Sequence, residues 1–231
     1  MIEVEKKEIK KIKTFLFMTS KGGCGKTLCS CLFADKLLSI GKFVNIVDVD
    51  ANQVAQKWVN KCKDLGRVVS YPLTLKNSLN PNQNIADIRI VDTPGILGSY
   101  LPYLKKNDKD NLFIIIVGRS AESDFEVNEE LYKDSDLDGF RDRVYFLVNS
   151  YSDSSETQKE YFEKLKKLVS DYDNVSHILS PIKYRWGDSY GYSDFLKGSD
   201  KNYFSKDSKN IVAKDLKETM KELLELAGVE S

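Results

Sequence analysis

Residues 14–40 read TFLFMTSKGGCGKTLCSCLFADKLLSI and decide the fold of the chain. Thr14–Met18 is an apolar run of strand length, and Lys26–Ile40 has the pattern of a helix that ends at Gly41. Between them lies a glycine-rich turn, Ser20–Thr27, which joins a buried strand directly to a helix. This strand–turn–helix unit is typical of α/β proteins with a parallel sheet.

The rest of the chain repeats this alternation of strand and helix patterns. The further expected strands are Phe43–Asp48, Arg67–Leu73, Ile85–Asp92, Asn111–Gly118 and Arg143–Asn149. The further expected helices are Asn52–Leu65, Ser123–Lys133, Ser155–Tyr172 and Asn210–Ala227. We therefore predict an α/β fold, with a mostly parallel, twisted sheet and helices on both faces. No linker divides the sequence, which predicts one domain over 1–231 with a short charged N-terminal extension over 1–13.

The composition excludes several classes of protein. Lys and Arg number 35 and Asp and Glu number 35, so the net charge is zero, which argues against a polycationic nucleic-acid binder. The chain holds no apolar run long enough to span a membrane, and its N-terminus lacks the pattern of a secretion signal. The four cysteines form no C-x-x-C pair, which disfavours disulfide frameworks and zinc sites and suits a cytoplasmic protein.

The glycine-rich turn stands where a phosphate-binding loop would stand. Its glycines allow successive backbone N–H groups to curl around a phosphate, and the helix that follows adds its positive dipole end. Lys26 is expected to reach the β- and γ-phosphates of a nucleotide, and Thr27 to offer its hydroxyl to Mg²⁺. The residues predicted to bind the nucleotide here are Gly22, Gly23, Cys24, Gly25, Lys26, Thr27 and Leu28. The sequence thus indicates a P-loop NTPase.

The loop departs from the standard G-x-x-x-x-G-K-[ST] pattern in an informative way. Ser20 replaces the first glycine, and a second lysine, Lys21, follows it. The resulting K-G-G-x-G-K-[ST] is the deviant Walker A motif, and the chain here resembles the ParA/MinD group of ATPases. The resemblance implies an ATP-dependent sandwich homodimer, in which Lys21 reaches across to the partner's phosphates and, with Lys26, takes part in catalysis.

The second expected strand ends in two carboxylates, within VDVDAN, Val47–Asn52. Ligands of parallel α/β sheets bind at the carboxyl ends of the strands. Asp50 matches the second aspartate of the D-x-D-P-Q segment of the ParA/MinD group, which implies that it orients the attacking water. Ala51 replaces the proline of that segment. Asp48 has two open roles, one in the site and one as a brace of the loop.

Two later strand ends complete the predicted site. IRIVDTPG, Ile88–Gly95, resembles a Walker B segment, and Asp92 is expected to hold the Mg²⁺ shell directly or through a water molecule. The strand VYFLVNS ends near Asn149, which resembles the asparagine that reads the adenine edge in the ParA/MinD group. An amide both donates and accepts hydrogen bonds, so it suits this task.

The resemblance implies a short ParA-type partition ATPase whose ATP dimer binds DNA non-specifically. A ParB-like centromere-binding partner would stimulate an otherwise slow hydrolysis, and the protein would be associated with the nucleoid. The alternative is a MinD-like positioning switch that acts on proteins without DNA binding. A third reading, suggested by the altered segment around Asp50, is a nucleotide-binding protein that has lost hydrolysis.

Two further segments bear on this choice. The apolar stripe of the last expected helix is backed by a mixed polar face, which favours packing over insertion into anionic membranes. The aromatic segment Tyr184–Phe204, together with nearby lysines, fits either a DNA-contacting patch or a packed cluster. In and after the loop, Cys24, Cys29 and Cys31 are expected to be small packing residues. The alternative for Cys24 is a thiol whose pKa is lowered at the helix N-terminus and whose alkylation is sensitive to nucleotide.

Overall fold

The computed structural model of the protein describes residues 12–19, 21–66, 69–70, 86–94, 111–171, 177–183, 195–196 and 211–230. The strands are β1 Lys13–Met18, β2 Val44–Asp48, β3 Val69–Ser70, β4 Ile88–Asp92, β5 Leu112–Arg119, β6 Val144–Tyr151, β7 His177–Ile178 and β8 Ile182–Lys183. The helices are α1 Lys26–Ser39, α2 Val54–Asp64, α5 Glu122–Lys133, α6 Glu156–Asp171 and α8 Ile211–Ala227. Two 3₁₀ turns, Ser135–Leu137 and Arg141–Arg143, lead from α5 into β6.

The strands form one sheet in the order β3-β2-β4-β1-β5-β6-β7, with β8 also paired to β6. Each of these pairings is parallel, so the carboxyl ends of the strands meet at one edge. At that edge Asp48 of β2 stands in register with Asp92 of β4, and Arg119 of β5 with Asn149 of β6. The predicted α/β class and parallel sheet are confirmed.

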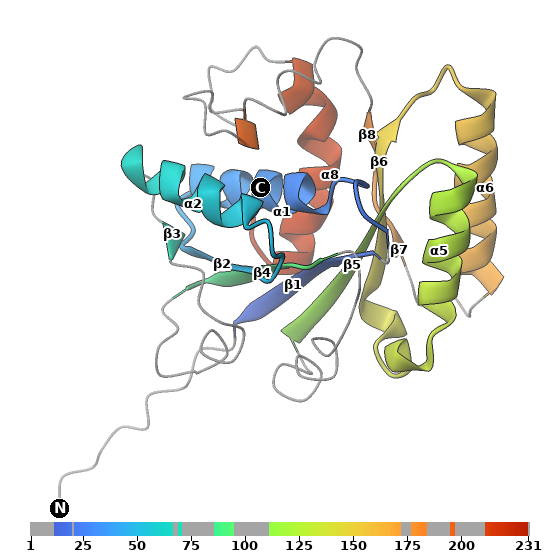
Figure 1. Ribbon diagram of the computed structural model, residues 1–231, viewed down its shortest axis with the longest axis horizontal. Helices are drawn as coiled ribbons and strands as arrows, with labels where there is room; N and C mark the ends of the chain where they lie inside the picture. Colours follow the sequence, from blue (N-terminus) through green and yellow to red (C-terminus); the bar gives the residue numbers. More distant parts are fainter. Residues whose placement is uncertain are drawn as a thin grey trace, which may run out of the picture.

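Helices cover both faces of the sheet, as the alternating pattern predicts. α1, α2 and α8 lie on one face, and α5 and α6 lie on the other (Figure 1). Alternate residues of β1 explain this: Phe15 and Phe17 face the first group of helices, while Leu16 and Met18 face the second. Because the central strands are buried on both faces, they read as continuous apolar runs.

The structure differs from the sequence-based expectation mainly at short elements. β7 and β8 were not expected, because two-residue strands carry too little sequence to show a period. α2 begins at Val54 instead of Asn52, because Gln53 adopts a left-handed backbone with φ 52° that a helix cannot include. Of the expected strand Arg67–Leu73, only 69–70 lie within the described residues.

The stripe of the last helix packs against the sheet, as predicted. Leu216, Met220 and Leu223 of α8 are buried in the core that α1 and α2 share. At the neighbouring turn, Glu222 accepts hydrogen bonds from the backbone N–H and the hydroxyl of Ser180 at 2.6 and 2.7 Å. Within the described part of the chain, no helix is long and apolar enough to cross a membrane.

Candidate functional site

The phosphate loop joins β1 to α1 at the carboxyl edge of the sheet (Figure 1). Gly23 and Gly25 have φ values of 77° and 97°, in the left-handed region that favours glycine, and Gly25 is the N-cap of α1. No side chain among the described residues caps α1, and its first turn holds no acidic residue. The first N–H groups of α1 are therefore available to an anion. Ser20 lies outside the described residues.

Lys26 folds back over this loop from the first position of α1. Its side chain is only 7% exposed, and its ammonium donates to the backbone carbonyl of Lys21 at 3.2 Å and to Cys24 Sγ at 3.9 Å. The buried ammonium thus lies inside the loop that would hold a phosphate. Thr27 follows it, half-buried, on the side of Asp92. The structure brings together the two side chains that the motif predicts at the phosphates and at the metal.

Asn149 is brought to the same loop from the end of β6. Its amide Nδ2 donates to the carbonyl of Cys24 at 2.9 Å. A Cβ atom added to Gly25 would lie 2.1 Å from this Nδ2, so the glycine is required for the close approach. The next residue, Ser150, has a φ of 62°, which is strained for a residue with a side chain, and it lies at an irregularity in the pairing of β6 with β8. Asn149 therefore supports the nucleotide loop, and its contact to adenine stays a prediction.

Asp92 is a carboxylate buried at the carboxyl edge of the sheet. It is fully buried at the end of β4, and neither of its oxygens has a hydrogen-bond partner among the described residues. Burial raises the pKa of Asp92 to about 7, a rise that the Thr27 hydroxyl and the Lys26 ammonium oppose and the neighbouring Asp48 and Asp50 reinforce. Carboxylate oxygens are ligands that Mg²⁺ prefers, so these two oxygens and the Thr27 hydroxyl fit such an ion.

Asp48 braces the loop that follows β2, which is one of its two predicted roles. Its oxygens accept hydrogen bonds from the backbone N–H groups of Asp50 at 3.0 Å and of Gln56, in the first turn of α2, at 2.9 Å. Burial nevertheless raises the pKa of Asp48 above its ordinary value. Asp50 is half-buried, and one of its oxygens accepts from the N–H of Asn52 at 2.8 Å. Asp50 thus stands at the predicted edge, and its catalytic role stays a prediction.

Lys21 makes contacts that the sequence did not indicate. Its ammonium lies 2.7 Å from Asp124 Oδ1 and 2.6 Å from the hydroxyl of Ser123, both in the first turn of α5. One sequence signal could have indicated Asp124: it closely follows a buried strand, as Asp50 does. The pairing itself joins residues about a hundred positions apart, and no local pattern specifies it.

Cys24 packs as a small buried residue, and the lowered pKa that its alternative role requires is not found. Cys24 is fully buried, and this burial raises the pKa of its thiol even though the Lys26 ammonium and hydrogen bonds oppose the rise. The helix N-terminus does not compensate for the loss of water. Cys29 and Cys31 are also fully buried, in the core beneath α1, where they serve as small packing residues.

No protein-family model and no curated protein matches this chain. Solved structures do match it over most of its length. A protein of Borrelia burgdorferi B31, named for plasmid partition and bound to AMPPNP, is 16% identical with a TM-score of 0.66, over 93% of this chain and 99% of that chain. The MinC:MinD cell division complex of Aquifex aeolicus matches at 15% identity and a TM-score of 0.64, over 95% of this chain and 96% of that chain.

A third structure, pNOB8 ParA bound to nonspecific DNA, is 16% identical with a TM-score of 0.63, over 94% of this chain and 99% of that chain. At such low identities these likenesses concern the fold. They cover the whole sheet and the loop at its carboxyl edge, since each match spans 93% or more of this chain. The chain therefore has the fold of the ParA/MinD-type P-loop ATPases.

Proposed function

We propose that this protein is a ParA-like ATPase that forms an ATP-dependent sandwich dimer, binds DNA non-specifically and drives DNA partition. One observation carries the proposal: two lysines, Lys21 and Lys26, serve one phosphate loop at the sheet edge where Asp50 and Asp92 also stand. Lys26 is needed for the phosphates of its own subunit. Lys21 is left for a second task, which the deviant motif assigns to the partner's phosphates.

The residues of the site divide the work of hydrolysis. The loop Gly22–Leu28 binds the phosphates through its N–H groups and the Lys26 ammonium, and Asn149 holds the loop and reads adenine. Thr27 and Asp92 would hold Mg²⁺, which when bound neutralises charge on the phosphate oxygens. Asp50 orients the attacking water. A ParB-like partner completes this arrangement, so ATP hydrolysis is slow until that partner binds.

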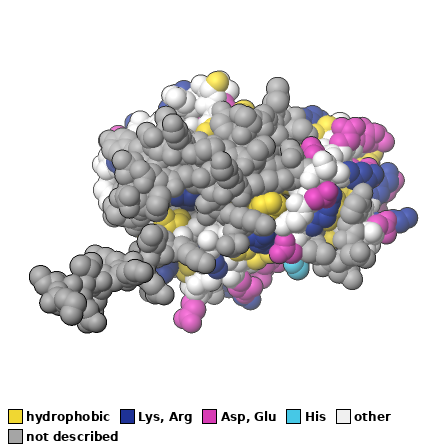
Figure 2. Space-filling model, turned by 90° about the horizontal axis from the view of Figure 1, so that it is seen from below, with side chains coloured by type: hydrophobic (Ala, Val, Ile, Leu, Met, Phe, Trp, Pro, Cys, Tyr) yellow, Lys and Arg dark blue, Asp and Glu magenta, His cyan; other side chains and the backbone are white. Residues whose placement is uncertain are grey.

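DNA binding is supported by fold likeness more than by charge. The matched pNOB8 ParA was solved bound to nonspecific DNA. On the face seen in Figure 2, Lys and Arg side chains lie intermixed with Asp and Glu side chains among the coloured residues. Most of the aromatic segment Tyr184–Phe204 lies outside the described residues, so its role as a DNA patch stays a prediction.

The first test is binding to non-specific duplex DNA with ATP, with ADP and without nucleotide, at two salt concentrations. We expect binding with ATP only, with affinity that falls about tenfold or more between about 50 and 200 mM salt. Lys21→Ala should abolish it, whereas Lys61→Ala, which removes an exposed lysine at the end of α2, should not. If ATP drives dimerisation but no condition gives binding to DNA, the function is a MinD-like positioning switch that acts on proteins.

A second test concerns hydrolysis at Asp50. Asp50→Asn keeps an oxygen that can accept the hydrogen bond from Asn52 but removes the charge that would orient water. We expect its ATP turnover to fall about 100-fold while ATP binding persists, with exposed Asp64→Asn as the matched control. Turnover at the unchanged rate would remove Asp50 from catalysis. An inactive native protein that binds ATP would instead support a switch without hydrolysis.

A further inference from the structure

We propose that Asp124 is a latch that holds Lys21 in its own subunit until a partner's phosphates compete for the lysine. This inference rests on the proposed function, because it concerns how the ATP dimer is kept from forming too early. It assigns to Asp124, Ser123 and Arg119 a regulatory role that no motif of the loop contains.

The latch is a two-point contact on one ammonium. Lys21 Nζ lies 2.7 Å from Asp124 Oδ1 and donates to the Ser123 hydroxyl at 2.6 Å. Together these contacts satisfy much of the hydrogen-bonding capacity of the ammonium inside its own subunit. A single ammonium cannot hold this position and also reach a phosphate on another subunit. Dimerisation through Lys21 therefore requires the pair with Asp124 to break.

The two partners differ in their freedom to move. The Asp124 side chain is 2% exposed, whereas the Lys21 side chain is 33% exposed. Burial acts to raise the pKa of Asp124, yet hydrogen bonds from Lys21 and Arg119 hold it below its ordinary value, so the carboxylate is charged at neutral pH. Asp124 is thus a fixed, charged acceptor. Lys21 is the mobile part, with a long stem that can swing away.

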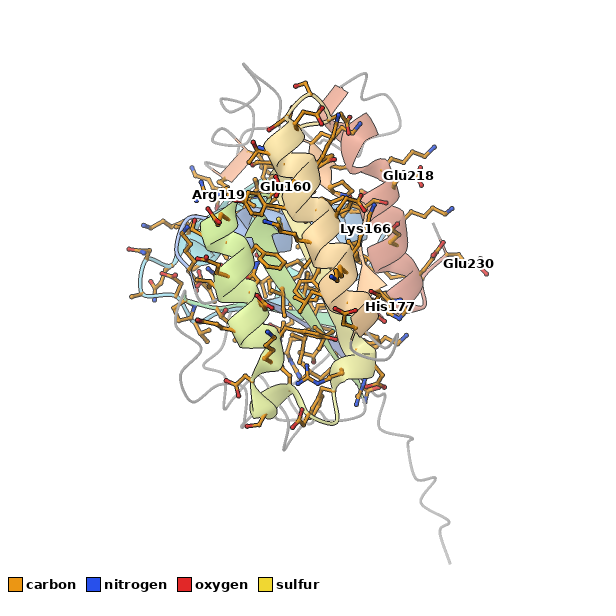
Figure 3. The ribbon with its side chains drawn as sticks, turned by 90° about the vertical axis from the view of Figure 1, so that its right-hand side faces the viewer. Arg119, Glu160, Lys166, His177, Glu218 and Glu230 are labelled. Atoms are coloured by element: carbon orange, nitrogen blue, oxygen red, sulfur yellow. The ribbon has the colours of Figure 1, made fainter. Side chains whose placement is uncertain are left out.

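Arg119 lowers the free energy needed to break the pair between Lys21 and Asp124. It binds the other oxygen of Asp124, with its backbone N–H at 2.8 Å and its Nε at 3.3 Å. A buried carboxylate left without any partner would be strongly destabilising, but this one keeps Arg119 after Lys21 leaves. The Arg119 side chain is 46% exposed and lies beside the N-terminal end of α5 (Figure 3). The pair can therefore open without leaving a bare buried charge.

The scaffold around the latch is anchored separately from the lysine side chain. Asn128 of α5 accepts a hydrogen bond from the Thr19 hydroxyl at 3.1 Å, and that hydroxyl accepts from the backbone N–H of Lys21 at 3.4 Å. A Cβ atom on Gly118 would lie 2.2 Å from Asn128 Nδ2, so α5 lies close against β5. These contacts tie α5 to the start of the loop. Opening then needs only rotation of the Lys21 side chain.

The test is ATP-dependent dimerisation of the full chain, measured by analytical ultracentrifugation over a range of protein concentrations. Asp124→Asn keeps the acceptor for the Arg119 N–H but weakens the hold on Lys21, so the dimer dissociation constant with ATP should fall about tenfold. Glu126→Gln removes the same charge from an exposed position of α5 and should leave the constant unchanged.

Arg119→Gln should act in the opposite direction. Without the guanidinium, Asp124 depends more strongly on Lys21, so the dimer should weaken several-fold. In the double variant with Asp124→Asn, Arg119→Gln should no longer weaken the dimer, because the carboxylate that couples Arg119 to Lys21 is gone. A merely structural role of Asp124 would lower thermal stability and dimerisation together, and would not produce opposite signs.

The outcomes separate this inference from the proposed function. If the native chain stays monomeric with ATP, the proposed dimer itself is wrong. If the native chain dimerises and Asp124→Asn weakens the dimer or leaves it unchanged, the latch is wrong while the dimer stands. A tighter Asp124→Asn dimer that still requires Lys21, shown by loss in the added Lys21→Ala variant, is the result that the latch predicts.

Discussion

Gly25→Ala is expected to weaken ATP binding by about 100-fold. The added Cβ would lie 2.1 Å from Asn149 Nδ2, and the φ of 97° is one that alanine rarely adopts. Either Asn149 must leave the carbonyl of Cys24 or the loop must rotate out of its phosphate-binding shape. Calorimetric titration with ATP, beside thermal unfolding of the nucleotide-free protein, measures both consequences.

Gly41→Ala is the matched control for this prediction. Gly41 also has a positive φ, 76°, but nothing lies within 4 Å of the place its Cβ would take, and it stands at the far end of α1. The Gly41→Ala variant should lose about 1 kcal/mol of folding stability and bind ATP as the native protein does. Adding Asn149→Ala to Gly25→Ala removes the clashing group and should restore part of the binding. Full ATP affinity in Gly25→Ala alone would show that the loop does not need this backbone shape.

The sequence was sufficient to predict the long elements and the site edge, because each rests on a local pattern. The apolar runs of β1 and β5 are continuous, and Arg89 interrupts that of β4, since both faces of these strands are buried. The loop residues are specified by the phosphate chemistry of one short segment. Asp92 could be placed for the same reason: it ends a buried strand. The parallel order of the strands then brings these ends to one edge.

What the sequence could not show depends on contacts between distant segments. The partner of Lys21 lies on α5, and which of several acidic residues it meets is settled only by the packing of that helix on β5. The role of Asp48 depended on where α2 begins, and Gln53 delays that start. For Cys24 two physical effects compete, and its depth of burial, which no motif encodes, decides the sign of the pKa shift.

Asp92→Asn is expected to stabilise the nucleotide-free protein while it lowers Mg²⁺-dependent ATP hydrolysis about 100-fold. The carboxylate is fully buried and makes no hydrogen bond with the described residues, so its charge costs stability until a cation is bound. The amide has the same shape and no charge. It removes this cost and, with it, the anionic oxygens that would hold Mg²⁺ beside Thr27.

The sign of the pH dependence gives this prediction a second check. The pKa of Asp92 is raised from 3.8 to about 7 in the folded chain, so the folded state holds a proton that the unfolded state has released across this interval. The contribution of Asp92 to folding stability is therefore lost as the pH rises from about 4 to about 7. The folding stability of Asp92→Asn should equal that of the native protein near pH 4, and its advantage in stability should grow as the pH rises to about 7.

Urea unfolding at several pH values, with EDTA present, measures that difference, and exposed Asp64→Asn serves as the control for a general change in charge. If Asp92→Asn is the less stable protein at pH 8, the carboxylate has a favourable partner, and its place in the metal shell loses its main support. A more stable but inactive variant would mean that the chain keeps a destabilising charge at this strand end because binding of the cation and nucleotide requires it.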